Sequence, residues 1–151
     1  MGKTTLLIID DETVLLKNVA EMLTGVADNI VTCDNPFKAV EILKKGNVHC
    51  VICDIFMPGM NGVEVIKKAR EMKNEVPFIF YTAHGNKDLM LEVAKYGAFD
   101  FIDKPNMDGL EHAVVQGLKV GVLQNSKVPG DDTNIRDYRK LLASLGDDSE
   151  D

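Results

Sequence analysis

Short apolar runs and segments of helical periodicity alternate five times along this chain of 151 residues. The apolar runs predict strands, and the periodic segments predict helices. Five alternating pairs joined by short connections indicate a doubly wound α/β domain, in which helices cover both faces of a parallel sheet. The predicted strands are Thr5–Asp10, Asn29–Cys33, Cys50–Asp54, Val76–Thr82 and Ala98–Ile102, and the predicted helices are Asp11–Leu23, Asn35–Lys45, Val63–Arg70, Asn86–Tyr96 and Met107–Leu123.

Polar residues stand at the carboxyl ends of the predicted strands, the edge at which open parallel sheets bind their ligands. The first strand ends at Asp10 and Asp11, the third at Asp54 and the fourth at Thr82, and Lys104 follows the fifth. We therefore expect these five side chains to lie at one rim of the sheet. Because three carboxylates in one place repel one another, we also expect a cation among them.

The expected site has the composition of a phosphoryl-binding site. Carboxylate oxygens suit Mg²⁺, with Mn²⁺ as a possible substitute. Lys104 supplies a second positive charge, and Thr82 supplies a hydroxyl group. A metal ion and a lysine offset the charge of a transferring phosphoryl group, while a carboxylate can accept it covalently.

The same residues make the chain resemble the receiver domain of two-component response regulators, over about residues 4–124. The resemblance implies a flavodoxin-like fold of five βα units with strand order 2-1-3-4-5. It also implies a stand-alone receiver domain over residues 1–124, followed by an appendage over residues 125–151. The residues that carry it are Asp10-Asp11, Asp54 followed by Met57-Pro58 and Gly62, Thr82-Ala83, and Lys104-Pro105.

The resemblance implies a role for each residue of the site. Asp54 would accept a phosphoryl group from a phosphohistidine on a histidine kinase or a histidine phosphotransfer protein. Mg²⁺ would be bound by Asp11, Asp54 and the backbone carbonyl of Phe56, while Asp10 would act largely through a metal-bound water. Lys104 would pair with the acyl phosphate, and its peptide bond to the following proline would be cis.

The resemblance also implies how the signal is switched and timed. Thr82 would move to hydrogen-bond a phosphoryl oxygen, and Phe101 would swing inward when it moves. Phe56 and His84 occupy the two positions that tune phosphate lifetime. A phenylalanine cannot position an attacking water, so we expect moderate to slow loss of the phosphate. A downstream protein would bind the helix 86–96, the strand 98–102 and the helix 107–123.

Charge and hydropathy exclude other classes of function. The net charge of −7 argues against nucleic acid as a direct partner, because phosphate binding depends on clustered lysines and arginines. No apolar segment approaches the roughly 20 residues of a membrane span, and the apolar run near the start is too short for a signal peptide. We therefore expect a cytoplasmic protein that signals through protein contacts and turns over no separate substrate.

Four other interpretations of the sequence are each opposed by a particular residue or spacing. A metal-dependent phosphatase acting through an aspartyl intermediate would prefer a second acid two residues after the nucleophile, where this chain has Phe56. An interaction module with a vestigial site would not need the intact set of acids and lysine. Gly2–Thr5 is similar to the end of a P-loop but lacks the upstream glycine and strand. Cys50 and Cys53 are spaced like a redox or zinc pair, but residues three apart in a strand point to opposite faces.

The composition changes after Leu123. Residues 125–130 are mostly polar and include Pro129-Gly130, and the spacing of apolar residues predicts a short amphipathic helix over residues 133–145, followed by an acidic end. This length cannot hold a DNA-binding domain. Two interpretations remain open: the segment packs on its own domain, or it docks on a partner or a second protomer, which would make a homodimer.

Overall fold

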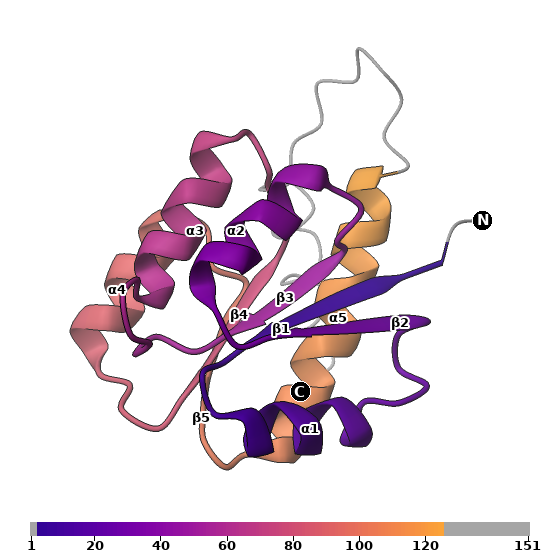
Figure 1. Ribbon diagram of the computed structural model, residues 1–151, viewed down its shortest axis with the longest axis horizontal. Coiled ribbons are helices and arrows are strands. Elements are labelled where there is room, and N and C mark those ends of the chain that lie inside the picture. Colours follow the sequence, from indigo (N-terminus) through magenta and orange to yellow (C-terminus); the bar gives the residue numbers. More distant parts are fainter. Residues whose placement is uncertain (1–2, 126–151) are drawn as a thin grey trace, which may run out of the picture.

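Five parallel strands form the centre of the computed structural model, which describes residues 3–125 (Figure 1). Their order in the sheet is β2-β1-β3-β4-β5. The doubly wound fold and the strand order expected for it are therefore confirmed. The strands are β1 (Thr5–Ile9), β2 (Asn29–Cys33), β3 (Cys50–Cys53), β4 (Phe78–Thr82) and β5 (Asp100–Asp103).

Helices cover both faces of the sheet (Figure 1). Helices α1 and α5 pack on one face, and α2, α3 and α4 pack on the other. Side chains alternate between the two faces along each strand: Leu6 and Ile8 face α1 and α5, whereas Leu7 and Ile9 face the opposite layer. Burial on both faces explains why the strands read as continuous apolar runs. The helices are α1 (Thr13–Met22), α2 (Pro36–Lys45), α3 (Gly62–Glu71), α4 (Lys87–Lys95) and α5 (Met107–Asn125).

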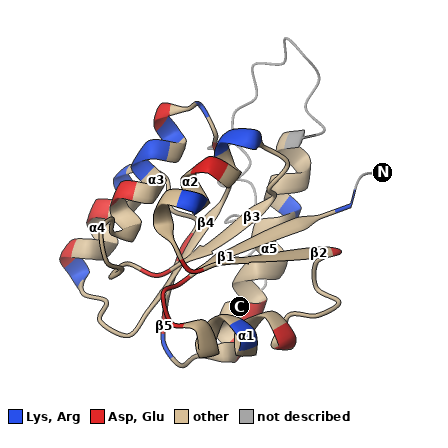
Figure 2. Cartoon of the chain, viewed as in Figure 1, with Lys and Arg blue, Asp and Glu red and all other residues tan. Residues whose placement is uncertain are grey.

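Side-chain caps set where several helices begin. Asn35, the first residue of the predicted helix 35–45, accepts hydrogen bonds from two backbone N–H groups at the start of α2 and is its N-cap, so that α2 begins at Pro36. Helix α3 begins one residue before the predicted Val63, because Asn61 and Glu64 form a capping box around its first turn. Figure 2 shows segments of basic and acidic residues along α2, α3 and α4.

The first helix begins at Thr13, two residues later than the sequence pattern predicts. The backbone N–H of Glu12 donates to Asp10 Oδ1 at 2.9 Å, so the chain turns around this aspartate before the helix starts. Asp11 is therefore not the N-cap of α1. Glu12 occupies that position without making a side-chain cap.

The last two strands begin later than predicted. Strand β4 starts at Phe78 rather than Val76, because Val76 bonds to side chains of the segment before it: its N–H donates to Asn74 and its carbonyl accepts from Arg70. Strand β5 starts at Asp100 rather than Ala98, because the Ala98 N–H donates to the carbonyl of Val93 at the end of α4. At both places, hydrogen bonds to residues at or just after the end of a helix keep apolar residues out of the strand.

The two cysteines of the Cys50-x-x-Cys53 sequence lie in different layers of the core. Both are buried and free, and burial raises the pKa of Cys50 to about 12 and that of Cys53 well above its usual value. They pack on opposite faces of the sheet, as expected for residues three apart in a strand, and so do not form a redox or zinc pair. Thr5 begins a strand rather than a helix, which removes the P-loop interpretation. Within residues 3–125, none of the helices has the length and apolar character needed to span a bilayer.

Candidate functional site

Three side chains from three strand ends meet at the carboxyl rim of the sheet. Asp10 follows β1, Asp54 follows β3 and Lys104 follows β5. The Lys104 ammonium lies 2.9 Å from Asp10 Oδ2 and 3.4 Å from Asp54 Oδ2. Asp10 is only 2% exposed and Asp54 only 6% exposed. The fold thus brings together two buried acids and one lysine that lie up to 94 positions apart in the sequence.

Asp54 is held at the end of β3 by backbone contacts on both sides. Its N–H donates to the carbonyl of Ile9 at 3.0 Å, which continues the ladder from β1. Its Oδ1 accepts the N–H of Ile55 at 2.7 Å, so that Oδ2 is the oxygen on the Lys104 side. The first residue of α3, Gly62, sits directly against this turn: a β-carbon there would overlap the carbonyl of Asp54. The apolar strand and the glycine loop together fix the carboxylate in one place.

Lys104 is anchored through its own backbone and its long side chain. Its N–H donates to the carbonyl of Thr82 at 3.0 Å, and its peptide bond to Pro105 is cis. Its ammonium lies 5.8 Å from the centre of the Tyr81 ring, a favourable position for a cation. The side chain therefore crosses from beyond β5, over β4, to reach the acids beside β1 and β3. Figure 2 shows the acidic segments at this end of the sheet.

The electrostatics of the site are dominated by burial. Desolvation raises the pKa of Asp10, although hydrogen bonds from the Glu12 N–H and Lys104 act in the opposite direction. Burial acts to lower the pKa of Lys104, but its hydrogen bond to Asp10 and the charges of Asp10, Asp54 and Glu12 together raise it. The pKa of Asp10 rises because burial outweighs its hydrogen bonds, and the pKa of Lys104 rises because the surrounding acids favour its charged form. The lysine stays charged, and the acids exceed it in number.

The carboxylates form a set of oxygen donors that fits a small divalent cation. One oxygen each from Asp10, Glu12 and Asp54 lies within 4.8 Å of the others. Glu12 Oε1 is also 3.9 Å from the Lys104 ammonium. Glu12 was not among the residues predicted to form the site, although it directly follows Asp10 and Asp11 in the sequence. Asp11 is exposed and does not belong to this set.

Thr82 and Phe101 occupy neighbouring strands beside the acids. Thr82 is fully buried at the end of β4, where its hydroxyl accepts the N–H of His84 at 3.4 Å. Phe101 is half-buried in β5, with its ring centre 6.4 Å from that of Phe80. A β-carbon on Gly85 would press on the Phe101 ring. The loop after Thr82 therefore lies directly over Phe101.

Phe56 and His84 contact each other above the rim. Their ring centres are 6.1 Å apart and their planes meet at 73°, an edge-to-face arrangement. Phe56 comes from the loop after β3 and is 49% exposed, while His84 comes from the loop after β4. Both residues were expected to tune the lifetime of the phosphate, but the contact between their rings was not predicted from the sequence.

Comparison with known proteins agrees with this geometry. A model of the response regulator receiver domain matches residues 6–115, which is most of the chain. The chain belongs to this family. The C4-dicarboxylate transport transcriptional regulatory protein DctD of Pseudomonas aeruginosa is 31% identical over 82% of the chain. The transcriptional regulatory protein FixJ of Bradyrhizobium diazoefficiens is 28% identical over 72% of it.

Solved structures are similar over the same region. The signal receiver domain of a putative LuxO repressor protein from Vibrio parahaemolyticus aligns with a TM-score of 0.78 and 26% identity, over 86% of this chain and all of that one. A response regulator receiver domain from Clostridium thermocellum aligns with a TM-score of 0.72 and 25% identity, over 80% of this chain and 98% of that one.

The curated relatives are longer than the region they share with this receiver domain. The chain spans 53% of the length of FixJ and 28% of that of DctD. A protein-glutamate methylesterase/protein-glutamine glutaminase of Clostridium acetobutylicum matches over 39% of its length at 27% identity. The region shared with this chain thus occurs both in proteins named as transcriptional regulators and in one named as an enzyme.

Proposed function

We propose that this receiver domain accepts a phosphoryl group on Asp54 from a phosphohistidine and signals through protein contacts. The donor would be a histidine kinase or a histidine phosphotransfer protein. The observation that carries the proposal is the placement of the Lys104 ammonium against both Asp10 and Asp54 at a buried strand end. Two buried acids and one lysine are a poor arrangement for stability alone. They are a good arrangement for a site that receives a charged group.

In the proposed reaction, a carboxylate oxygen of Asp54 bonds to phosphorus as the bond from phosphorus to the donor nitrogen breaks. Ile55 holds Asp54 Oδ1 through its N–H, which keeps the carboxylate from rotating. Lys104 already contacts Asp54 Oδ2 and would pair with the oxygens of the incoming group. The imidazole of the donor leaves and takes up a proton. Within the receiver, the chain contributes position and charge rather than an acid or base.

We propose that the acidic set binds Mg²⁺, with Mn²⁺ as a substitute. Carboxylate oxygens and an open, partly hydrated site are what Mg²⁺ requires, and the oxygens of Asp10, Glu12 and Asp54 are close enough together to share one ion. Asp11 and the backbone carbonyl of Phe56 are the further ligands that the family resemblance implies. When bound, the ion would offset charge on the transferring phosphoryl group.

We propose that Thr82 and Phe101 carry the switch. Within the described part of the chain, the Thr82 hydroxyl accepts only the N–H of His84, at 3.4 Å, and it can turn toward a phosphoryl oxygen at little cost. The loop that follows Thr82 lies over the Phe101 ring, so this movement would open space into which the ring can turn. The changed surface would comprise α4, β5 and α5, where a downstream protein would bind.

The proposal is tested by measuring intact mass after incubation with Mg²⁺ and a small acyl phosphate. We expect wild type to gain the mass of one phosphoryl group and Asp54→Asn to gain none. Asp34→Asn is the matched control, because Asp34 is an exposed aspartate that also follows a strand, β2. It should gain mass as wild type does.

Two results would contradict the proposal. One is the absence of any mass gain in wild type, and the other is an equal gain in wild type and Asp54→Asn. Removing the divalent cation with a chelator should sharply reduce the gain of mass in every variant that shows one. A gain of mass unaffected by the chelator would show that the reaction needs no metal ion.

A further inference from the structure

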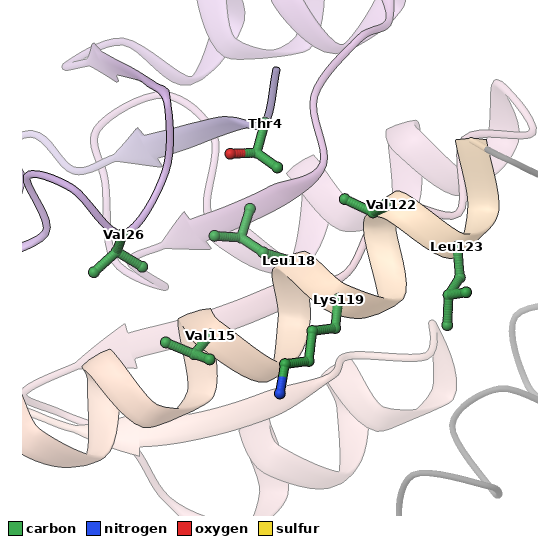
Figure 3. Close-up of a pocket in the computed structure, with 7 residues that line it drawn as sticks. All are labelled: Thr4, Val26, Val115, Leu118, Lys119, Val122 and Leu123. Atoms are coloured by element: carbon green, nitrogen blue, oxygen red, sulfur yellow. The ribbon is translucent and has the colours of Figure 1, made fainter. Parts of the chain in front are cut away.

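An apolar groove runs along α5 at the opposite end of the sheet from Asp54 (Figure 3). Its volume is about 500 Å³. Val115, Leu118 and Leu123 of α5 line one side, and Val26 of the loop before β2 lines the other. Leu123 is 42% exposed, and Val26 and Val115 are half-buried. The groove is therefore a hydrophobic surface that the described part of the chain leaves open to solvent.

We propose that residues 133–145 of this same chain form a helix that docks in this groove, within one molecule. Their apolar residues recur at helical spacing, and at about 100° per residue they fall within an arc of about 120°. The basic residues Arg136, Arg139 and Lys140 lie outside that arc. The apolar stripe consists of Ile135, Tyr138, Leu141, Leu142 and Leu145.

The length of the chain allows this return. Helix α5 ends at Asn125, beside the groove, and seven residues separate it from the predicted helix. Seven residues reach at most about 25 Å when extended, whereas the groove from Val115 to Leu123 covers about 12 Å of α5. Connections of this length are common between antiparallel helices, and Pro129-Gly130 supplies residues typical of a turn.

The net charges of the two partners have opposite signs. Residues 133–145 hold three bases and one acid, a net charge of +2, whereas residues 1–130 hold 17 acids and 14 bases, a net charge of −3. The one acid, Asp137, stands next to the apolar stripe, where it can approach the exposed Lys119 that lines the groove. A tethered segment also reaches its site at an effective concentration in the millimolar range. Docking on its own domain is thus favoured over docking on a second copy. This interaction does not depend on phosphorylation of Asp54.

Cysteine pairing tests the proposal in the full-length chain. Val26→Cys is combined with Leu142→Cys on the apolar stripe, or with Arg136→Cys on the opposite face as the matched control. The three native cysteines are buried and do not compete. Under mild oxidation we expect the Leu142 pair to form a disulfide within one molecule, and the Arg136 pair to form it several-fold less, since a disulfide requires α-carbons within about 7 Å.

A cross-linked dimer in place of a cross-linked monomer would overturn the proposal in favour of a second copy. Equal cross-linking of the Leu142 pair and the Arg136 pair would also overturn the proposal, because the segment would then have no preferred face. The absence of a cross-link in both pairs would overturn it as well.

Hydrogen exchange provides a second, independent readout. Leu123→Asp places a charge in the groove at a position already 42% exposed, and Leu91→Asp, at a position 54% exposed on α4, is the control. We expect Leu123→Asp to speed exchange of the amides of residues 133–145 about tenfold, because their protection would come from docking. Leu91→Asp should leave it unchanged. Wild-type amides that exchange at unstructured rates, or equal effects of both variants, would reject the proposal.

Discussion

At the scale of single residues, the site holds more buried negative charge than one lysine can balance. Asp10 and Asp54 are buried, Glu12 lies nearby, and Lys104 contacts all three. Burial raises the pKa of Asp10 despite the hydrogen bond from Lys104. The cost of desolvating this acid is therefore not recovered within the unmodified chain. Such a cost is expected where a protein keeps acids for binding a cation rather than for stability.

The first prediction concerns Asp10. Asp10→Asn should raise the free energy of unfolding at pH 7 by about 1 kcal/mol, because the amide keeps the contact with the Glu12 N–H and removes one of the repelling charges. Lys104 retains Asp54 as a partner at 3.4 Å. Chemical denaturation of Asp10→Asn, with Asp34→Asn as an exposed control, measures the change. A loss of stability in Asp10→Asn would show that its pairing with Lys104 outweighs the burial.

The same residue predicts a pH dependence. The folded state holds a proton on Asp10 more tightly than the unfolded state, because its pKa is raised above 3.8. Its destabilising effect is thus complete above the raised pKa, and it disappears as the pH falls through that value toward 3.8. The difference in unfolding free energy between wild type and Asp10→Asn should narrow as the pH is lowered from 7. A difference that widens would contradict the direction of the shift.

We also expect single residues to set the lifetime of the phosphate. Phe56→Asn should speed the loss of phosphate on the order of tenfold, because an amide can hold a water in position to attack and a phenyl ring cannot. Phe37→Asn is the control: Phe37 is 53% exposed, close to the 49% of Phe56, but it lies over Gly59 rather than against His84. The decay of phosphorylated protein over time is the measurement. An unchanged rate in Phe56→Asn would remove this residue from the timing of the signal.

At the scale of elements, the site exists because strand ends from distant parts of the sequence meet at one rim. The apolar runs, the polar residues that end them and the helix caps at Asn35 and Asn86 were all predictable from local patterns. Residues whose roles depend on other elements were not. Arg70 donates to carbonyls of residues 74, 76, 96 and 97, and Glu12 joins the acids only because α1 starts late. Contacts of this kind leave no periodic signal.

Helix α3 is predicted to control the position of Asp54. Gly62→Ala should lower the free energy of unfolding by about 2–4 kcal/mol, because the added methyl group overlaps the carbonyl of Asp54 and lies 3.0 Å from the Phe80 ring. Gly109→Ala in α5 is the control, since a β-carbon there meets only the end of the Asn106 side chain. It should cost less than about 1 kcal/mol. Equal losses in thermal or chemical unfolding would show that the close approach at Gly62 is readily relieved.

At the scale of the whole molecule, we assign different tasks to the two ends of the sheet. The carboxyl end holds the acids, Lys104, Thr82 and Phe101, on which the proposed phosphoryl transfer and its switch depend. The amino end holds the groove beside α5, which the family resemblance did not suggest. The sequence predicted the first because its residues form a recognisable set. The sequence did not predict where residues 133–145 bind, because an amphipathic pattern does not identify the surface on which it packs. These residues also lie outside the described part of the chain.

The most direct test of the account is to locate the phosphoryl group on the chain. Wild-type protein is incubated with Mg²⁺ and a small acyl phosphate, digested, and its peptides are analysed by mass spectrometry. We predict that the added mass falls on the peptide containing Asp54 and on no other, in keeping with its placement between the end of β3 and Lys104. Added mass on a peptide containing Asp10 or His84 instead, or on no peptide at all, would contradict the account.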